Sequence, residues 1–435
     1  MSRQPETESE HDMPDEIREM TREFVQGAAF QKAVADAERE PYAVPVDFLR
    51  RCVELGCLGM DAPEAYGGSG LSPSEQATII EELSRGHAGL GLAVLVQNSL
   101  CGYPILTFGN EEQKRKYLPR MASGELLVSF GLSEPKNGSD AKGIQLTARR
   151  AEGRDGWLLK GAKRWITNAD RAGLIVLATR TGSVESRGRG LTVFLVELSD
   201  DLPGLSRPTP YNKLGQAGST LCEVIFDDVF VPDAAMLGEL NQGWDVINST
   251  LEHSRVAIAA QAVGIARSAL DAAEEYAGQR MQFGKLLREH PPVANHLAIM
   301  RRQVELAHYL VMRAAHQEEA GDPLAFVWAS LAKLIASETA IWAAGDAMLL
   351  HGGMGYVNDM PISRIFRDSA VLRIYEGAAH IQVKIVERYL DRDKIIALFP
   401  PQAALMRDPA DLTPLDDVIA ESEVWQPQSL ATAAS

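Results

Sequence analysis

Two changes in the spacing of apolar residues divide the chain into three parts. From residue 15 to about residue 121, apolar side chains recur at steps of three and four, as at Ile17, Met20 and Phe24, which is the period of an amphipathic helix. Between residues 126 and 237 the period shortens to two, which is the period of a strand. After residue 243 long helical periods return. The pattern therefore predicts helices, then strands, then helices again.

The middle part has several runs with the strand period, and turn residues such as Asp155-Gly156 and Arg189-Gly190 separate neighbouring runs. The runs cover residues 127–130, 144–148, 157–159, 174–178, 191–198 and 222–231. Short strands joined by turns favour an antiparallel sheet rather than a parallel one, which needs a longer crossover between strands.

The expected fold is therefore α+β, with the helices and the strands in separate domains. We expect an N-terminal α-helical domain at residues 15–125, a middle antiparallel β domain at 126–240 and a C-terminal four-helix bundle at 241–392. A disordered N-terminus at residues 1–14 and a C-terminal tail at 393–435, rich in proline, alanine and serine, complete the prediction.

Composition and charge exclude several kinds of partner. The chain has 435 residues, of which 46% are hydrophobic and 23% are charged, and its net charge of -16 would repel a nucleic acid backbone. The first residues are acidic and polar, unlike a signal or transit peptide, and no apolar run appears long enough to span a bilayer. We therefore expect a cytoplasmic protein with no membrane insertion and no nucleic acid partner.

The common cofactor motifs are also missing. No G-x-G-x-x-G follows the first strand, no P-loop is present, and no H-E-x-x-H offers a zinc site. The four cysteines lie in apolar stretches without a metal-ligand spacing, which is typical of buried free thiols. These absences disfavour NAD, a nucleotide cradled in a P-loop and a catalytic metal.

Two segments of the middle part carry side chains suited to a planar polar ring. Residues 130–140 end a strand in hydroxyls, exposed amides and glycines, and residues 163–168 place the Trp165 indole and the Thr167 hydroxyl at alternate strand positions. Taken alone, a polar turn and a core tryptophan would explain both segments as well.

Together with other motifs in the same order, these segments resemble the acyl-CoA dehydrogenase family, and the resemblance runs from about residue 15 to about residue 392. The further motifs are Pro63–Gly68, Lys213–Gly215, Phe226–Val229, Arg280–Gly284, Gly352–Tyr356 and Arg373–Gly377. The resemblance implies FAD as cofactor. It also implies a homo-oligomer, a dimer or a tetramer, with FAD at the subunit interface.

The resemblance assigns roles to individual residues of this chain. The residues that would contact FAD are Phe130, Leu132, Ser133, Trp165 and Thr167 at the flavin ring, and Arg280, Phe283 and Gly353, the first two of which would come from a neighbouring subunit. The residues that would contact the thioester are Ser139, Arg255, Tyr375 and Gly377. No metal ligand is implied.

Removing hydrogen from Cα and Cβ of an acyl thioester needs a base for the α proton and an acceptor for the β hydride. The resemblance makes Glu376 the base and flavin N5 the acceptor. A minority of the family places the base immediately before the arginine of the first bundle helix, but Ser254 occupies that position here and cannot act as a carboxylate base. The expected product is a trans-2-enoyl thioester, and electrons would pass to an electron-transfer flavoprotein.

Some positions depart from the family pattern and keep other readings open. Leu349 and Ala378 replace a glutamine and a threonine that contact FAD, and Ala217 and Leu221 replace an arginine and a threonine. An oxidase or flavin monooxygenase using O2 on the same fold is one alternative, and a non-catalytic binding or assembly relative is another. The substrate is expected to be a short- or branched-chain acyl group on CoA or on an acyl carrier protein.

Overall fold

The computed structural model describes residues 13–40 and 46–389, and it divides the chain into one compact unit up to Ile385 and a second unit from Val386 onward. The predicted C-terminal tail at residues 393–435 lies outside the described residues. So does the predicted disordered N-terminus, except that helix α1 already begins at Met13.

The N-terminal part of the first unit is helical, as the sequence predicts. Its elements are α1 (Met13–Gln26), α2 (Ala28–Arg39), α3 (Val46–Glu54), η1 (Glu64–Tyr66), α4 (Pro73–Gly86), α5 (Ala88–Leu95), the π-helix η2 (Val96–Gly102), α6 (Tyr103–Phe108) and α7 (Glu111–Ala122). Capping boxes fix two of the helix starts, because Ser72 pairs with Glu75 at α4 and Asn110 pairs with Gln113 at α7.

The middle part forms one mixed sheet that is mainly antiparallel. Its strands are β1 (Val128–Gly131), β2 (Thr147–Arg150), β3 (Gly156–Thr167), β4 (Leu174–Arg180), β5 (Leu191–Glu197), β6 (Leu205–Ser206), β7 (Leu221–Pro232) and β8 (Met236–Leu237), in the order β6-β7-β3-β2-β4-β5-β8. Beyond the expected antiparallel pairs, β1 runs parallel to β4, and Thr147 of β2 also pairs in parallel with Arg180 of β4. Leu159, Phe194 and Phe226 lie fully buried in the core of the sheet.

The C-terminal part is a bundle built on three long helices. They are α8 (Gly243–Gln279), α9 (Pro291–Glu319) and α10 (Ala325–His351), followed by η7 (Gly352–Tyr356), α11 (Pro361–Ser369), η8 (Ala370–Arg373) and α12 (Ala379–Tyr389). A hairpin of β9 (Met281–Gln282) and β10 (Lys285–Leu286) separates α8 from α9. The shorter α11 packs against α8 and α10, so it occupies the place of the fourth bundle helix.

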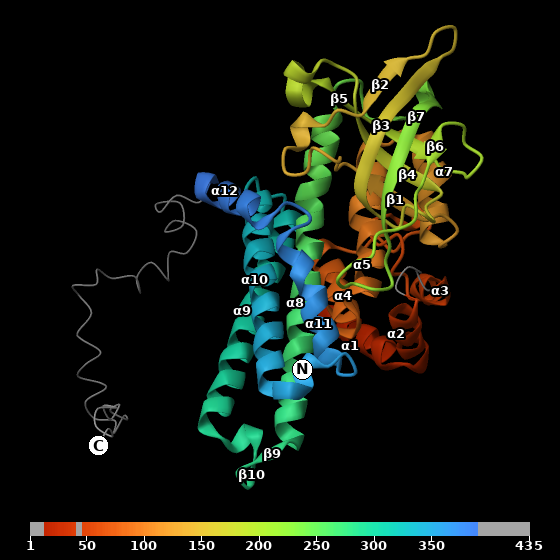
Figure 1. The fold of residues 1–435 in the computed structure, drawn as a ribbon. Coiled ribbons are helices and arrows are strands. Elements are labelled where there is room, and N and C mark those ends of the chain that lie inside the picture. The colour runs from red at the N-terminus through yellow and green to blue at the C-terminus, as the bar shows by residue number, and fades with distance from the viewer. Residues whose placement is uncertain (1–12, 41–45, 390–435) are drawn as a thin grey trace, which may run out of the picture. The chain divides into compact units, whose positions relative to one another are not determined.

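Helix α8 connects all three parts of the unit. It packs against α4 of the helical part, against β5 of the sheet, and against α9 and α10 of the bundle, and Figure 1 shows it running from the sheet down to the hairpin. Ion pairs cross the same junction, because Arg267 on α8 binds both the fully buried Glu81 of α4 and Glu305 of α9. Residues at opposite ends of α8 can therefore contribute to different sites of the protein.

Two helical stretches, Ala88–Phe108 and Gly243–Gln279, have the length and mean hydropathy of a membrane span, so the expectation that no apolar run is long enough was wrong. Of their most apolar windows, 89% and 72% respectively are buried inside the fold, which marks them as core helices. All four cysteines are buried and free, as predicted. Among the described residues, no cluster of three or more histidine, cysteine or acidic side chains could hold a metal ion.

Candidate active site

The candidate base lies in a turn between η8 and α12. Glu376 has φ 51° and Gly377 has φ 83°, so two consecutive residues adopt left-handed backbone conformations. Glycine accepts this conformation freely, whereas for glutamate it costs about 1–2 kcal/mol. The glutamate therefore needs surrounding contacts that hold it in place, and three helices supply them.

The carboxylate of Glu376 receives a hydrogen bond from α8. The Ser254 hydroxyl donates to Glu376 Oε2 at 2.8 Å. The next residue, Arg255, is 6% exposed, and its Nε has no hydrogen-bond partner among the described residues. Burial raises the pKa of Glu376, while the Ser254 hydroxyl and the charges of Lys333 and Arg255 act to lower it. The pKa of Glu376 therefore stays above that of a solvated glutamate, although the positive charges of Lys333 and Arg255 favour its ionised form.

The backbone of the turn is held from α10 and α12. Lys333 Nζ on α10 donates to the carbonyl of Gly377 at 2.9 Å. Gln382 Nε2 on α12 donates to the same carbonyl at 2.9 Å and to the carbonyl of Glu376 at 3.3 Å. Because both donors are fully buried, water does not compete for these bonds.

The tyrosine that precedes the base is anchored separately. The Tyr375 hydroxyl donates to Gln261 Oε1 on α8 and accepts from Gln216 Nε2 at 3.5 Å. Gln216 is held in turn, because its backbone N–H donates to the buried Asp368 and its carbonyl accepts from Lys213 Nζ at 2.6 Å. The turn is therefore fixed on both sides of Glu376.

The two strand-end segments found in the sequence lie side by side. Lys163, which is fully buried on β3, donates to the carbonyl of Leu132 at 2.9 Å and to Glu134 Oε1 at 2.8 Å. The N–H of Arg164 donates to the carbonyl of Ser133 at 2.9 Å. Phe130 and Ser133 stay partly accessible beside this brace, while Leu132 is nearly buried. A rigid strand end with partly open polar and aromatic groups fits a planar ring such as a flavin.

Trp165 does not follow the regular strand alternation that the sequence suggested. The register of β3 against β7 shifts between Lys163 and Ile166, and Trp165 has φ 63° inside that shift. A bulge of this kind re-aims a side chain, and the indole is 53% exposed, 4.9 Å from the ring of Tyr211. Thr167 ends the same strand and is half-buried, so both residues remain available to a ligand.

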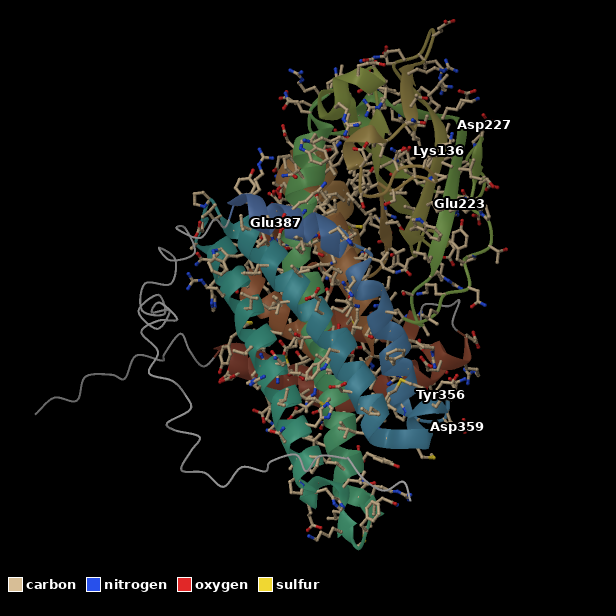
Figure 2. All side chains as sticks on the ribbon, turned by 60° about the vertical axis from the view of Figure 1, so that its left-hand side comes forward. Lys136, Glu223, Asp227, Tyr356, Asp359 and Glu387 are labelled. Carbon is tan, nitrogen blue, oxygen red and sulfur yellow. The ribbon has the colours of Figure 1, made fainter. Side chains whose placement is uncertain are left out.

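Two of the remaining cofactor candidates, Arg280 and Phe283, follow α8 and lie far from the base. Arg280 follows Arg255 by 25 residues along and just past α8, which corresponds to roughly 37 Å of helix. Phe283 in the hairpin is 94% exposed, and Gly353 after α10 is exposed as well. Figure 2 labels Tyr356 in the same turn as Gly353, and its side chain is 87% exposed.

A pocket of about 400 Å³ lies beside the start of α8. Its lining includes Lys142, Arg187, Arg189 and Trp244, and Lys142 Nζ sits 4.4 Å from the Trp244 ring centroid. Ser139 is exposed in the loop that leads to Lys142, and Lys136, labelled in Figure 2, belongs to the same loop. Trp244 precedes Ser254 by ten residues on α8, or roughly 15 Å of helix.

A helical domain, a sheet and a helical bundle with the Glu376 carboxylate held against the bundle define the class of protein, and family models identify it. The models for the N-terminal, middle and C-terminal domains of acyl-CoA dehydrogenases match residues 11–125, 129–229 and 241–390. The chain belongs to the acyl-CoA dehydrogenase family. It is accordingly an FAD-dependent oxidoreductase, as its sequence predicted.

Individual relatives agree with this assignment. The short-chain specific mitochondrial acyl-CoA dehydrogenase of Homo sapiens is 40% identical over 85% of this chain and 88% of its own length. The butyryl-CoA dehydrogenase structure from Megasphaera elsdenii matches with a TM-score of 0.81 and 33% identity, covering 89% of this chain and 99% of that one. The prolyl acyl carrier protein oxidase AnaB matches with a TM-score of 0.81 and 30% identity, covering 87% and 98%.

Sequence reasoning missed the side chains that hold the base turn. The sequence marks Ser254 only as an alternative position for a base that holds no acid, yet its hydroxyl donates to Glu376. Lys333 is a lone charge in the apolar run 327–336, and Gln261 and Gln382 are amides buried in helices. A polar residue inside an apolar helical face is the signal that could have identified all three.

Proposed function

We propose that the protein converts a short- or branched-chain acyl thioester to its trans-2-enoyl thioester, with Glu376 removing the α proton. The observation that carries the proposal is the geometry of Glu376, which is a carboxylate in a strained turn, bonded to Ser254 and facing Lys333 and Arg255. A base has to be ionised before it can accept a proton and basic enough to take one. Burial makes Glu376 more basic, and the two cations favour its ionised form.

The other residues have supporting roles in this proposal. Arg255, with an unpaired Nε, would bind polar groups of the thioester next to the base, while Tyr375 and Gly377 would line the path of the acyl group. FAD would be held by Phe130, Leu132, Ser133, Trp165, Thr167 and Gly353, with Arg280 and Phe283 of a neighbouring subunit. When bound, FAD supplies the acceptor for the β hydride.

A short acyl group is supported by the wall of the site next to the base. Cys101 in η2 is fully buried, and both burial and the charge of nearby Glu376 raise the pKa of its thiol. Just beyond it, the Tyr103 ring stacks on His253 at 4.1 Å. Filled space this close to the base would limit the room for a long chain, which agrees with the short-chain human relative.

Coenzyme A is supported over an acyl carrier protein by the pocket beside α8. Lys142 and Arg189 suit phosphate groups and the Trp244 indole suits an adenine ring, while Arg187 is paired with Asp140 and the lining also includes Glu185 and Asp245. The pocket lies roughly 15 Å along α8 from Ser254, a distance that an extended pantetheine arm would cover. The carrier-protein alternative gains its support from the similarity to the acyl carrier protein oxidase.

Partners and location belong to the same proposal. An electron-transfer flavoprotein would receive the electrons, and two or more copies of the chain would assemble so that the exposed Arg280 and Phe283 reach FAD. The cytoplasmic location stays a prediction from the sequence. The second candidate function is an oxidase that passes electrons to O2, again because a related structure is an oxidase.

Anaerobic titration of the purified, FAD-loaded protein with acyl-CoA substrates tests the proposal. Short or branched acyl-CoA should bleach the flavin absorbance of the wild type, and Glu376→Gln should retain FAD while bleaching at least about a thousandfold more slowly. Glu112→Gln, at an exposed glutamate on α7 far from the base in the sequence, is the control and should bleach normally. Undiminished bleaching by Glu376→Gln would refute the role of the base.

Readmission of air then separates the candidates. Slow reoxidation of the substrate-reduced flavin is expected of a dehydrogenase, whereas rapid peroxide formation would favour the oxidase. A colourless protein that cannot take up added FAD would instead favour a non-catalytic relative.

A further inference from the structure

We propose that Lys333 is a positioning residue for the base: it holds the carbonyl of Gly377 and supplies the buried positive charge that keeps Glu376 ionised. This inference rests on the proposed function, in which Glu376 removes the α proton. It adds a residue from α10, which no sequence motif around the base includes.

The position of Lys333 is unusual for a lysine. Its side chain is fully buried, and among the described residues its one hydrogen bond goes to the carbonyl of Gly377 at 2.9 Å. In the described part of the chain, no carboxylate lies within 4.0 Å of Lys333 to form an ion pair. Lys163, the other fully buried lysine cited above, has Glu134 at 2.8 Å. Burying a lysine without a contacting carboxylate costs free energy. We therefore expect the positive charge of Lys333 to have a function.

The charge that Lys333 faces is Glu376. Burial lowers the pKa of Lys333 to about 8, and among the groups acting on it only Glu376 favours the ammonium form, while Arg255 opposes it. The ammonium form is therefore stabilised by the ionised base, and the ionised base is stabilised by the ammonium group in return. The two groups form a coupled pair across the base turn.

The other groups around Glu376 do not duplicate this charge. From α8, the neutral Ser254 donates a hydrogen bond and Arg255 is partly offset by Glu252. From η2 comes the Cys101 thiol, whose pKa burial raises well above its usual range, and from the turn itself comes Tyr375, whose pKa burial also raises. Both groups are neutral at physiological pH, so Lys333, bonded to the residue next to the base, is the cation on which no acid other than Glu376 acts among the described residues.

A purely structural role is the competing explanation. In that case Lys333 would act only as a hydrogen-bond donor that fixes the turn, and losing it would slow the reaction equally at every pH. A charge effect has a different signature. Without the cation the pKa of Glu376 rises, so the base becomes protonated at a higher pH and the acid limb of kcat/KM moves upward.

The test uses the FAD-loaded enzyme with three substitutions of Lys333, and kcat/KM is measured across pH. Lys333→Met removes charge and donor, Lys333→Gln removes only the charge, and Lys333→Arg keeps both. For Met and Gln the acid limb should move up by about one pH unit, which is a tenfold loss on that limb that shrinks at higher pH. Lys333→Arg should leave the limb within a few tenths of the wild type.

Ser337→Ala is the matched control. Ser337 lies one turn further along α10, is buried, and donates to the carbonyl of Leu372 at 3.2 Å, so its loss weakens the same segment without removing charge. It should lower kcat/KM slightly without moving the limb. If Met and Gln variants lose activity with an unmoved limb, as Ser337→Ala does, the proposal is wrong.

The same experiment separates this inference from the function on which it rests. A wild type that acyl-CoA does not bleach would overturn the proposed function itself. A wild type that bleaches, together with an inactive Glu376→Gln and an unmoved acid limb in Lys333→Gln, would leave the function standing and overturn only the role of Lys333. Should Lys333→Met fail to fold, the Gln and Arg variants carry the comparison.

Discussion

The turn around Glu376 and the hairpin around Phe283 belong to the same proposed active site, but they are built in opposite ways. The turn is held by buried side chains of its own chain, from α8, α10 and α12. The hairpin presents Phe283 with 94% of its surface exposed, and a Cβ added at Gly284 would meet nothing within 4 Å. The Glu376 turn makes its contacts within a single chain, whereas the hairpin leaves Phe283 exposed to solvent.

This contrast separates two requirements of the chemistry. The base needs a fixed position and a tuned charge, which only dense packing gives. The proposed cofactor contacts of the hairpin need access, because they would reach FAD bound to another copy of the chain. Substitutions in the turn should therefore change rate with little effect on FAD affinity, and substitutions in the hairpin should do the reverse.

The largest effect is expected for Gly377→Ala in the turn. An added Cβ would lie 2.3 Å from Gln382 Nε2 at a residue with φ 83°, so Gln382 would have to release the carbonyls of Glu376 and Gly377. The strain costs about 1–2 kcal/mol, and displacing the base by even 1 Å can cost about a hundredfold in rate. Stopped-flow bleaching should slow by about a hundredfold, while FAD binding stays near wild type.

Gly321→Ala provides the control for strain alone. Gly321 also has a left-handed φ, 64°, but a Cβ there would meet nothing within 4 Å. This variant should lower the free energy of unfolding by about 1 kcal/mol and leave the rate of flavin bleaching unchanged. If Gly377→Ala instead weakened FAD binding as much as it slowed bleaching, the turn and the cofactor contacts would not be independent.

The next effect is expected at the hairpin, from Arg280→Ala. Loss of charge-assisted bonds to a diphosphate should weaken FAD binding about tenfold or more, whereas bleaching at saturating FAD should change little. Fluorescence titration of the apoprotein with FAD measures the first quantity and stopped-flow the second. Arg301→Ala, at an exposed arginine paired with Glu274 on α8, should change neither.

The outcome at Arg280 also bears on assembly. If the weakened FAD binding is restored in mixed oligomers with a Glu376→Gln chain that keeps its own Arg280, the arginine acts across the interface. An unchanged FAD affinity in Arg280→Ala would remove the hairpin from the cofactor site.

The two regions also differ in how well sequence alone could predict them. The strand period marked the core of the sheet, and capping residues such as Ser72 and Asn110 marked helix starts, because both signals are local. The run read as 157–159 is really the start of β3 (Gly156–Thr167), because polar and exposed residues and a bulge hide the rest of the strand. Local sequence signals therefore predicted the presence of helices and strands better than the residues at which they end.

The contacts of the base turn were beyond local signals. Ser254 and Glu376 are 122 residues apart, and no sequence motif around either residue predicts the hydrogen bond between them. The family resemblance supplied Glu376 itself, but the donors that hold it depend on how α8, α10 and α12 pack. The exposed hairpin was easier to propose, because Arg280 and Phe283 form a motif of consecutive positions rather than a set of packed side chains.

The smallest predicted effect refines the contrast on its exposed side. Leu349 on α10 is 69% exposed one turn before Gly353, at a position where the family often has a glutamine that contacts FAD. Leu349→Gln should add one hydrogen bond worth about 1 kcal/mol, so FAD should bind severalfold more tightly while the bleaching rate stays constant.

Leu306→Gln, at another exposed leucine on α9, is the control for replacing surface apolar area and should leave FAD affinity unchanged. Equal effects of the two variants would mean that surface polarity, and not a restored contact, sets the affinity. A faster or slower bleaching rate in Leu349→Gln would show instead that the exposed contacts reach the base turn, which would break the division between the two regions.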